Sequence, residues 1–388
     1  MPLPPLNFPN LPGRPVPGDD VHFKITVNTT PCAPPQEIAD YDGQWLKIPL
    51  RELVVSGAIH YQNTNLPIIP GERALEGRMR TSWEDIWKAN PRTVSVDGRN
   101  RLIVGPIGDP DEQTRLSYIL GDTIGVAVAK RVFRVSYAAV RKRNYAPDVR
   151  HDFELATGNN RVKLETRGRY NRGHRTEALR QIGEKFGAVR DFNRAMGVLV
   201  FPSDDPNRAF EDVEIVDPEG EDAPPTRPYM ARQVLSHYLP YFDEQNVTMR
   251  FVIRGLLNME DAELEAVLAN GVPDILQSRN YRRIAHFGRI SLPLGDDRFF
   301  GTAYEGWAPP RWGGPEIPGA REGQFFWGVS RSVLRRLGTF QLLDLFRTGS
   351  GFQATTTDAG VQLFLFDDGI LVAWTPNWET LQQTVRES

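Results

Sequence analysis

The chain has 388 residues, enough for two or three domains that each bury a core. Its 40% hydrophobic and 24% charged residues are ordinary for a globular protein, and its formal net charge of −3 gives no overall attraction to nucleic acid. Cys32 is the only cysteine, which excludes an intramolecular disulfide and a cysteine-based zinc site. The histidines show neither H-x-H nor HExxH spacing, which argues against a zinc hydrolase. Because we find no signal peptide and no apolar stretch long enough to cross a bilayer, we expect a cytoplasmic protein without a membrane partner.

The N-terminal part of the chain divides into an arm and a β-rich region. Residues 1–20 are rich in Pro and Gly, so we expect an extended or disordered arm of the kind that can lie on a partner subunit. From 21 to 108, short β-like runs alternate with turn formers, which predicts a β-rich N-terminal domain without recognisable chemistry. The expected strands cover 21–28, 45–55, 58–62, 93–97 and 101–105.

A helix and a charged hairpin follow. Apolar residues at helical spacing predict a helix over 111–133. On this helix Asp122 is either a solvated acid, the interpretation we favour, or a further acidic residue of a functional site. The segment from Arg150 to Arg167 alternates apolar and charged residues on either side of a Gly-Asn-Asn turn, which predicts two antiparallel strands. With the turn centred on Gly158-Asn159, Asp152 faces Glu165 across the hairpin and Glu154 faces Lys163.

Two carboxylates opposite each other need compensation. Like charges on neighbouring strands destabilise a sheet, so Asp152 and Glu165 call for a cation or a shared proton. Mg²⁺ suits such a pair because it binds one or two carboxylates together with water and substrate phosphates.

The next helix carries further polar candidates. Residues 176–189 form an amphipathic pattern whose apolar positions include Ile182 and Phe186. Gln181 and Lys185 share one face of this helix by i,i+4 spacing and are able to reach the carboxylates, although an exposed polar face gives the same pattern. A buried strand is expected over 194–202.

These motifs, in this order, resemble the PD-(D/E)XK nuclease superfamily, which has the restriction-endonuclease-like fold. That family shows an Asp on one strand, E-x-K on the next, and often a Gln or Lys on the following helix. The resemblance covers about 110–215 and implies a nuclease domain over 109–215. It also implies that Asp152, Glu165 and the carbonyl of Thr166 hold Mg²⁺ or Mn²⁺.

The chain departs from the family pattern at one position, where Arg167 stands in place of the motif lysine. Arginine can stabilise negative charge on a phosphoryl group but cannot deprotonate, and its head is larger than an ammonium group. Lys163 and Lys185 are two lysines able to stand in for it. The implied catalytic set is Asp152, Glu165, Arg167, Lys163, Gln181 and Lys185.

Basic residues are dense in this middle part of the chain, which favours nucleic acid as a partner of the central domain. An alternative is that arginine is abundant along the whole chain because of genome composition. The basic residues are Arg131, Arg134, Arg141, Lys142, Arg143, Arg150, Arg161, Lys163, Arg167, Arg169, Arg172 and Arg175.

The remainder of the chain predicts a linker and a C-terminal domain. The acidic, Pro-rich composition of 202–228 is typical of a linker or lid, and we place the linker itself at 216–228. Residues 229–388 mix helical and strand patterns, including an expected strand over 247–255, and predict an α+β domain. Trp307 and Trp312 lie in a long loop that either stacks on bases or a protein partner, or packs on its own domain.

The expected fold is therefore multidomain: a central restriction-endonuclease-like α/β domain flanked by a β-rich N-terminal domain and an α+β C-terminal domain. The leading hypothesis for function is a metal-dependent nuclease that hydrolyses phosphodiester bonds of DNA or RNA, with a role in restriction or antiphage defence by family analogy. The alternatives are a catalytically degenerate nuclease-fold scaffold or nucleic-acid-binding module, and a structural assembly protein that forms a homo-oligomer or binds a protein partner.

Overall fold

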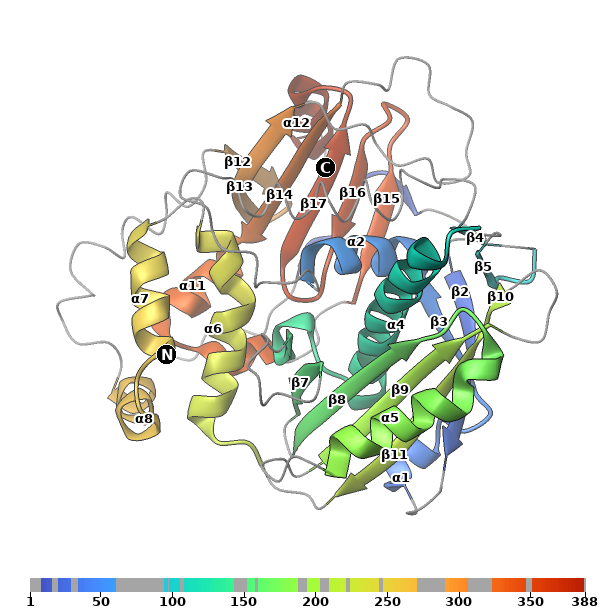
Figure 1. The fold of residues 1–388 in the computed structure, drawn as a ribbon. Coiled ribbons are helices and arrows are strands. Elements are labelled where there is room, and N and C mark those ends of the chain that lie inside the picture. The colour runs from blue at the N-terminus through green and yellow to red at the C-terminus, as the bar shows by residue number, and fades with distance from the viewer. Residues whose placement is uncertain are drawn as a thin grey trace. The chain divides into compact units, whose positions relative to one another are not determined.

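The computed structural model describes two compact units, and each is presented by itself (Figure 1). The α/β unit comprises Gly18–Val135 and Val140–Pro225, and the terminal unit comprises Met1–Pro17, Ser136–Ala139 and Thr226–Ser388. The described residues are 8–15, 20–28, 34–60, 94–96, 98–104, 108–142, 152–157, 160–187, 194–202, 209–220, 224–243, 247–270, 290–305, 323–346 and 351–386.

A seven-stranded mixed sheet forms the centre of the α/β unit, in the order β3-β2-β11-β9-β8-β7-β6. Neighbouring strands are antiparallel except for the parallel pairs β8/β9 and β2/β11. Their bounds are β2 Asp20–Asn28, β3 Trp45–Pro49, β6 Val140–Lys142, β7 Phe153–Ala156, β8 Arg161–Gly168, β9 Arg194–Phe201 and β11 Asp212–Gly220. A separate three-stranded sheet contains β4 Val94–Val96, β5 Leu102–Val104 and β10 Ala209–Phe210.

The predicted hairpin is present in the predicted register. Glu154 pairs with Lys163 and Phe153 pairs with Leu164, so continuing the ladder by one residue brings Asp152 to the level of Glu165. Strands β7, β8 and β9 are neighbours in one sheet, as the alternation of apolar and charged residues indicated.

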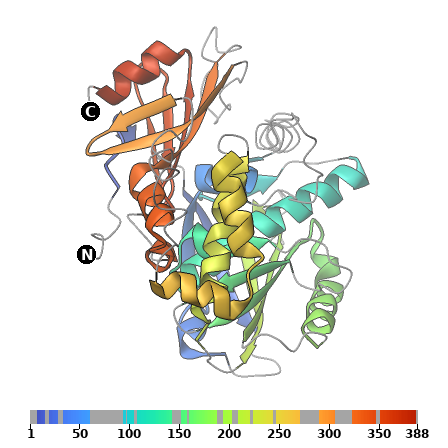
Figure 2. The ribbon, with the colours of Figure 1, turned by 90° about the vertical axis from the view of Figure 1, so that its left-hand side faces the viewer.

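Two helices cover opposite faces of this sheet, α4 Pro110–Phe133 and α5 Arg175–Gly187 (Figures 1 and 2). Side chains of β8 alternate between them: Thr166 lies against Gly125 of α4, whereas Glu165 reaches Lys185 of α5. The sheet is therefore buried on both sides at β8. The unit also contains α1 Gln36–Ala39, α2 Leu50–His60 and the 3₁₀ helix η3 Arg172–His174.

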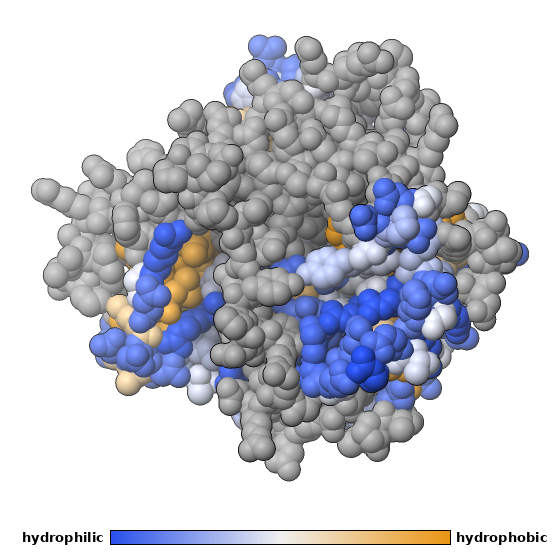
Figure 3. All heavy atoms as spheres, in the orientation of Figure 1, coloured by the Kyte–Doolittle hydropathy of each residue, from blue (hydrophilic) through white to orange (hydrophobic). Residues whose placement is uncertain are grey.

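Helix α5 is held by a small apolar cluster. Ala178, Ile182 and Phe186 pack against Leu199, Phe201 and Val216 of the sheet. The remaining positions of α5 are mostly polar, and Figure 3 shows hydrophilic side chains gathered over this part of the surface. The predicted amphipathic helix is confirmed.

Helix α4 approaches β8 so closely that both elements need glycine. A Cβ added at Gly168 would overlap the carbonyl oxygen of Ser117, and one added at Gly121 would overlap the backbone nitrogen of Gly168. This contact places the first half of α4 beside the end of β8, where the candidate site residues lie.

The terminal unit contains an antiparallel sheet in the order β1-β15-β16-β17-β14-β13-β12. Its strands are β1 Arg14–Pro15, β12 Ile290–Leu294, β13 Asp297–Glu305, β14 Gln324–Ser330, β15 Gln353–Thr356, β16 Gln362–Leu365 and β17 Ile370–Thr375. Its helices are η2 Tyr137–Ala139, α6 Arg227–Asp243, α7 Val247–Leu257, α8 Asp261–Asn270, α11 Arg331–Thr339, η4 Leu342–Phe346 and α12 Trp378–Arg386.

The structure corrects the expected domain boundaries. Strands β2 and β3 belong to the same sheet as β8, so 21–108 is not a separate β-rich domain. The expected linker at 216–228 overlaps β11, which lies between β9 and β2. Its acidic composition was misleading because Val213 and Ile215 alternate with acids and are buried in the sheet.

Two local expectations are corrected as well. The expected strand over 45–55 ends at Pro49, and α2 begins at the next residue. The expected strand over 247–255 is helix α7, because its short apolar run fits both the helical and the strand period. Of the two alternatives for the N-terminal arm, the described part is extended: β1 pairs with β15, and Phe8 and Leu11 are buried. None of the described helices combines the length and apolar composition that a membrane span requires.

Replacing Gly168 tests the contact between α4 and β8. Gly168→Ala should lower the free energy of unfolding by about 2 kcal/mol or more, because the new methyl group meets backbone atoms that cannot turn aside. Gly183→Ala is the matched control: Gly183 lies in α5 with open space at its Cβ position, so alanine should stabilise by about 0.5–1 kcal/mol. Urea unfolding followed by tryptophan fluorescence measures both, and equal effects of the two substitutions would contradict the close contact.

Candidate active site

The two predicted acids meet around one ammonium group. Asp152 lies immediately before β7 and Glu165 lies in β8. The Lys185 Nζ atom on α5 is 2.7 Å from Oε1 of Glu165 and 3.7 Å from Oδ1 of Asp152. The backbone N–H of Thr166 donates to Oδ2 of Asp152 at 3.1 Å, which holds this carboxylate beside β8. The structure thus brings together Asp152, Glu165 and Lys185.

Arg167 binds all three oxygen atoms that were expected to hold a metal. Its Nη1 atom donates to Oδ2 of Asp152 at 3.1 Å and to the carbonyl oxygen of Thr166 at 2.9 Å. Its Nη2 atom contacts Oε1 of Glu165. We refer to Asp152, Glu165, Arg167 and Lys185 as the carboxylate cluster. In it, two cations already face two carboxylates.

Glu165 is the most constrained member of the carboxylate cluster. Its side chain is fully buried, and its Oε2 atom has no hydrogen-bond partner among the described residues. Burial raises the pKa of Glu165 to about 8, and the negative charge of Asp152 adds to the shift, while Arg167 and Lys185 lower it. Burial and the charge of Asp152 therefore outweigh the two cations at Glu165.

Lys163 and Gln181 do not join the carboxylate cluster. The Lys163 side chain is buried, donates to the carbonyl oxygen of Phe186 at 3.3 Å and lies over the Phe186 ring. Gln181 accepts from Arg169 at 2.7 Å and donates to Glu177 at 2.8 Å. Of the two lysines able to stand in for the motif lysine, Lys185 is the one that reaches the carboxylates.

Asp122 supports the site from the opposite face of the sheet, and its interpretation as a solvated acid is wrong. It is 3% exposed, accepts from the Thr166 hydroxyl at 2.6 Å and pairs with Lys142 at 2.7 Å. Burial raises its pKa, against the opposing charge of Lys142. The signal was present in the sequence: Asp122 lies between Leu120 and Ile124 on the apolar part of the helix, where an unpaired carboxylate is costly.

A cleft of about 510 Å³ adjoins the carboxylate cluster. It is lined by residues of the first half of α4, by the end of β8 and the residues that follow it, and by Gln181 of α5. The lining residues are Gln113, Thr114, Ser117, Tyr118, Thr166, Arg167, Gly168, Arg169, Tyr170, Asn171, His174 and Gln181. Among the described residues, the lining contains two arginines and one histidine but no Asp or Glu. Thr166 and Arg167 belong to both the cleft and the ligand set, so the two regions are continuous.

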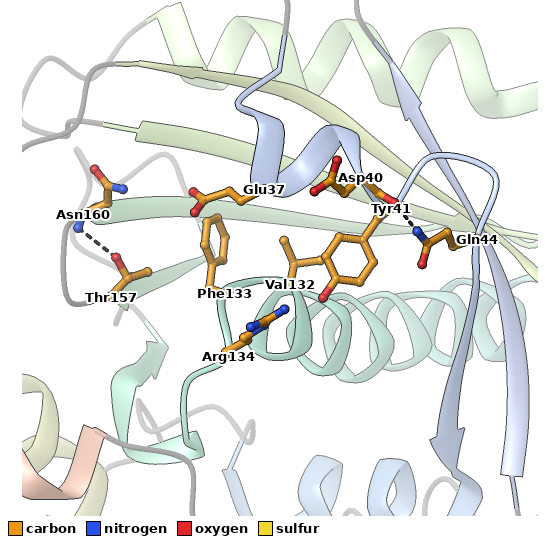
Figure 4. A pocket seen from close by; sticks show the side chains of 9 residues that line it. All are labelled: Glu37, Asp40, Tyr41, Gln44, Val132, Phe133, Arg134, Thr157 and Asn160. Atoms are coloured by element: carbon orange, nitrogen blue, oxygen red, sulfur yellow. Dashed lines mark hydrogen bonds between the residues drawn. The ribbon is translucent and has the colours of Figure 1, made fainter.

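A second cavity of the same unit, about 530 Å³, has a different character (Figure 4). It lies between α1 and the last turn of α4, and its lining includes Glu37, Asp40 and Arg134. It contains none of the predicted site residues. We therefore place the candidate site at the first cleft.

The basic run predicted from the sequence is not a continuous free surface. Arg172 pairs with Asp212 at 2.9 Å, and Arg175 pairs with Glu214 at 2.6 Å. Lys142 is bound to Asp122, as described above. Arg131 and Arg167 are also paired with acids, so at least five of the twelve basic residues neutralise acids of the fold. Trp307 and Trp312, the predicted stacking residues, lie outside the described residues.

Glu165 gives the unit a specific pH dependence. With a folded pKa of about 8 and an ordinary value of 4.5, Glu165 keeps a proton in the folded chain that the unfolded chain releases between these values. Raising the pH through this window therefore lowers stability. In EDTA, Glu165→Gln should become progressively more stable than wild type from about pH 5 to about pH 9, as thermal unfolding would show.

Glu177→Gln is the control for this comparison. Hydrogen bonds from Arg180 lower the pKa of the exposed Glu177 to about 2, so its loss should leave the pH profile unchanged over the same range. Parallel wild-type and Glu165→Gln curves would contradict a proton on Glu165.

Over the described ranges, no three His, Cys, Asp or Glu side chains converge as a metal-binding group. A metal here would rely on two carboxylates and a backbone carbonyl, a donor set that still suits Mg²⁺ or Mn²⁺. Comparison of the chain with protein-family models, with curated proteins and with solved structures found no match.

Proposed function

We propose that the α/β unit is a metal-dependent nuclease of the PD-(D/E)XK type, acting on phosphodiester bonds of DNA or RNA. One observation carries the proposal: two acids from adjacent strands converge, and the buried Oε2 atom of Glu165 has no hydrogen-bond partner among the described residues. The order of elements around them supports it, since α4, β7, β8, α5 and β9 follow one another as the resemblance implies.

The donor atoms fit a hard divalent cation. Asp152, Glu165 and the carbonyl of Thr166 supply oxygen ligands, and Mg²⁺ commonly completes such a set with water and substrate oxygens. Arg167 must release these oxygens for a metal to bind. The Arg167 side chain is 15% exposed and lines the cleft, so it can turn into the cleft when it releases these oxygens.

The chain's own residues would then divide the work. When bound, the metal supplies Lewis acidity toward a phosphoryl oxygen and lowers the pKa of a bound water. Lys185 and the displaced Arg167 would stabilise the negative charge that develops on the phosphoryl group. Asp122 holds the hydroxyl of Thr166, whose backbone N–H holds Asp152, so it acts as a positioning residue. A role in restriction or antiphage defence rests on analogy with the family.

A second function is favoured by the position of Arg167. Because its guanidinium binds all three candidate ligand atoms, the site is charge-balanced without a metal. In this alternative the unit is a degenerate nuclease fold that binds nucleic acid or serves as a scaffold, with the arginine in place of the metal.

Cleavage assays separate the two functions. Wild type should cut single-stranded or duplex nucleic acid in Mg²⁺ or Mn²⁺ but not in EDTA, and Glu165→Gln should reduce the rate by about a hundredfold or more because a metal-binding charge is lost. Arg167→Lys should retain or raise activity, since it restores the family residue with a smaller head.

Glu177→Gln is the control: it removes one negative charge from the exposed surface of α5 and should leave the cleavage rate unchanged. No cleavage by wild type or Arg167→Lys in either metal would reject the nuclease proposal and favour the degenerate one. Equal activity of wild type and Glu165→Gln would place the chemistry elsewhere.

A further inference from the structure

The cleft beside the carboxylate cluster has the composition of an anion-binding site. Among the described residues that line it, none is an Asp or a Glu. The other large cavity of the unit is lined by both acids and a base. Of the two arginines that line the first cleft, Arg167 is already paired with Asp152 and Glu165, so Arg169 is the one left for an anion.

Arg169 is the central cation of this cleft. Its guanidinium donates to the carbonyl oxygen of Gly168 at 2.9 Å and to Oε1 of Gln181 at 2.7 Å, both neutral acceptors. No carboxylate of the described residues forms an ion pair with it. Partial burial lowers the pKa of Arg169, and the like charge of Arg167 lowers it further. A bound anion would relieve both effects.

The wall opposite the arginines offers a flat aromatic surface. Tyr118 of α4 is 44% exposed, which is unusual among the large apolar side chains that the structure describes. Burial and the charge of Asp122 raise the pKa of Tyr118 to about 12, so the ring carries a neutral hydroxyl. Lys142 donates to this hydroxyl at 3.3 Å, and its Nζ atom lies over the ring, 5.2 Å from the ring centroid. A base can stack on the exposed part of such a ring.

The size of the cleft limits what enters it. A volume of about 510 Å³ lies within the range of small-ligand pockets, roughly 300–1,000 Å³, and suits one nucleotide rather than a duplex. Amide and hydroxyl groups of Gln113, Thr114 and Asn171 line the remainder and can meet base or sugar edges.

From these observations we infer that the cleft binds one nucleotide of a single-stranded nucleic acid, with its phosphate on Arg169 and its base against Tyr118. The strand then continues past Arg167 toward the carboxylate cluster. The inference rests on the proposed function for the identity of the ligand and adds to it strand type and two recognition residues. It does not require that the cluster be catalytically active.

Binding in EDTA tests the inference without any cleavage. Fluorescence anisotropy with a short single-stranded oligonucleotide should show that wild type binds it more tightly than the matching duplex. Arg169→Gln should weaken single-strand binding about tenfold or more, as expected for the loss of a charge-assisted contact. It should also make the slope of log K against log salt concentration less steep by about 0.7, the value for one phosphate contact on a single strand. Tyr118→Leu should weaken binding about fivefold to a hundredfold by removing one stacking contact.

Two further variants make the result specific. Arg180→Gln removes the same charge from the exposed face of α5, outside the cleft, and should change affinity less than about threefold. Arg169→Lys keeps the charge and should recover part of the affinity, which guards against a folding defect in Arg169→Gln. Inorganic phosphate as a competitor at millimolar concentration should displace the oligonucleotide weakly, because it lacks the base.

The outcomes separate this inference from the nuclease proposal. Arg169-dependent single-strand binding without cleavage in any metal keeps the inference and rejects the nuclease. Cleavage together with equal affinities for Arg169→Gln and Arg180→Gln rejects the inference and keeps the nuclease. Preference for duplex, or no binding by wild type, overturns the inference.

Discussion

The approach of two like charges, the half-buried Asp152 and the buried Glu165, at the open end of the β7–β8 hairpin is the constraint that organises the α/β unit. The register of the hairpin brings Asp152 to the level of Glu165, and the sheet buries Glu165 completely. Two neighbouring carboxylates, one of them buried, cannot both remain ionised without positive charge nearby. Arg167 from the same strand and Lys185 from α5 supply it. The position of α5 is thus fixed by electrostatics on one turn and by apolar packing on the others.

On the opposite face of the sheet, a second buried acid also has a cation beside it. Asp122 is buried on α4, and Lys142 and the Thr166 hydroxyl satisfy it. The close approach of α4 at Gly168 makes these contacts short and leaves the end of β8 open toward the cleft. This arrangement keeps paired acids on both faces of the sheet and leaves Arg169, which donates to neutral acceptors, beside the cleft. That separation of charge gives an otherwise acidic chain a local site for an anion.

The order of neighbouring helices and strands could be predicted where the sequence shows one clear pattern, either strand alternation or helical periodicity. The alternation around the Gly-Asn-Asn turn gave the hairpin and its register, and 3.6-residue periodicity gave α4 and α5. The strands beyond β9 could not be predicted, because β11 carries acids that resemble a linker and β2, which pairs with β11, comes from the distant N-terminal region. Such long-range pairing depends on tertiary packing rather than on local pattern.

The candidate site could be predicted only in part, because some of its contacts depend on tertiary packing rather than on local pattern. Asp152, Glu165 and Lys185 share a region because strand register and helical spacing are local properties. The exclusion of Lys163 depends on the depth at which Phe186 covers it, which spacing alone does not reveal. The contacts of Arg167 with all three ligand oxygens depend on rotamers. For this reason the sequence left open whether an arginine in the motif adds to a metal site or replaces it.

Calorimetric titration with Mn²⁺ tests the central claim, that the buried carboxylates form a cation site, most directly. It is best done above pH 8, where Glu165 is ionised. The account predicts one Mn²⁺ per wild-type chain, with binding lost in Glu165→Gln and strengthened in Arg167→Lys, because the guanidinium no longer competes for the same oxygens. Proton release on binding should grow as the pH falls below 8. Absence of binding to both wild type and Arg167→Lys would contradict the claim and leave Arg167 as the permanent occupant of the site.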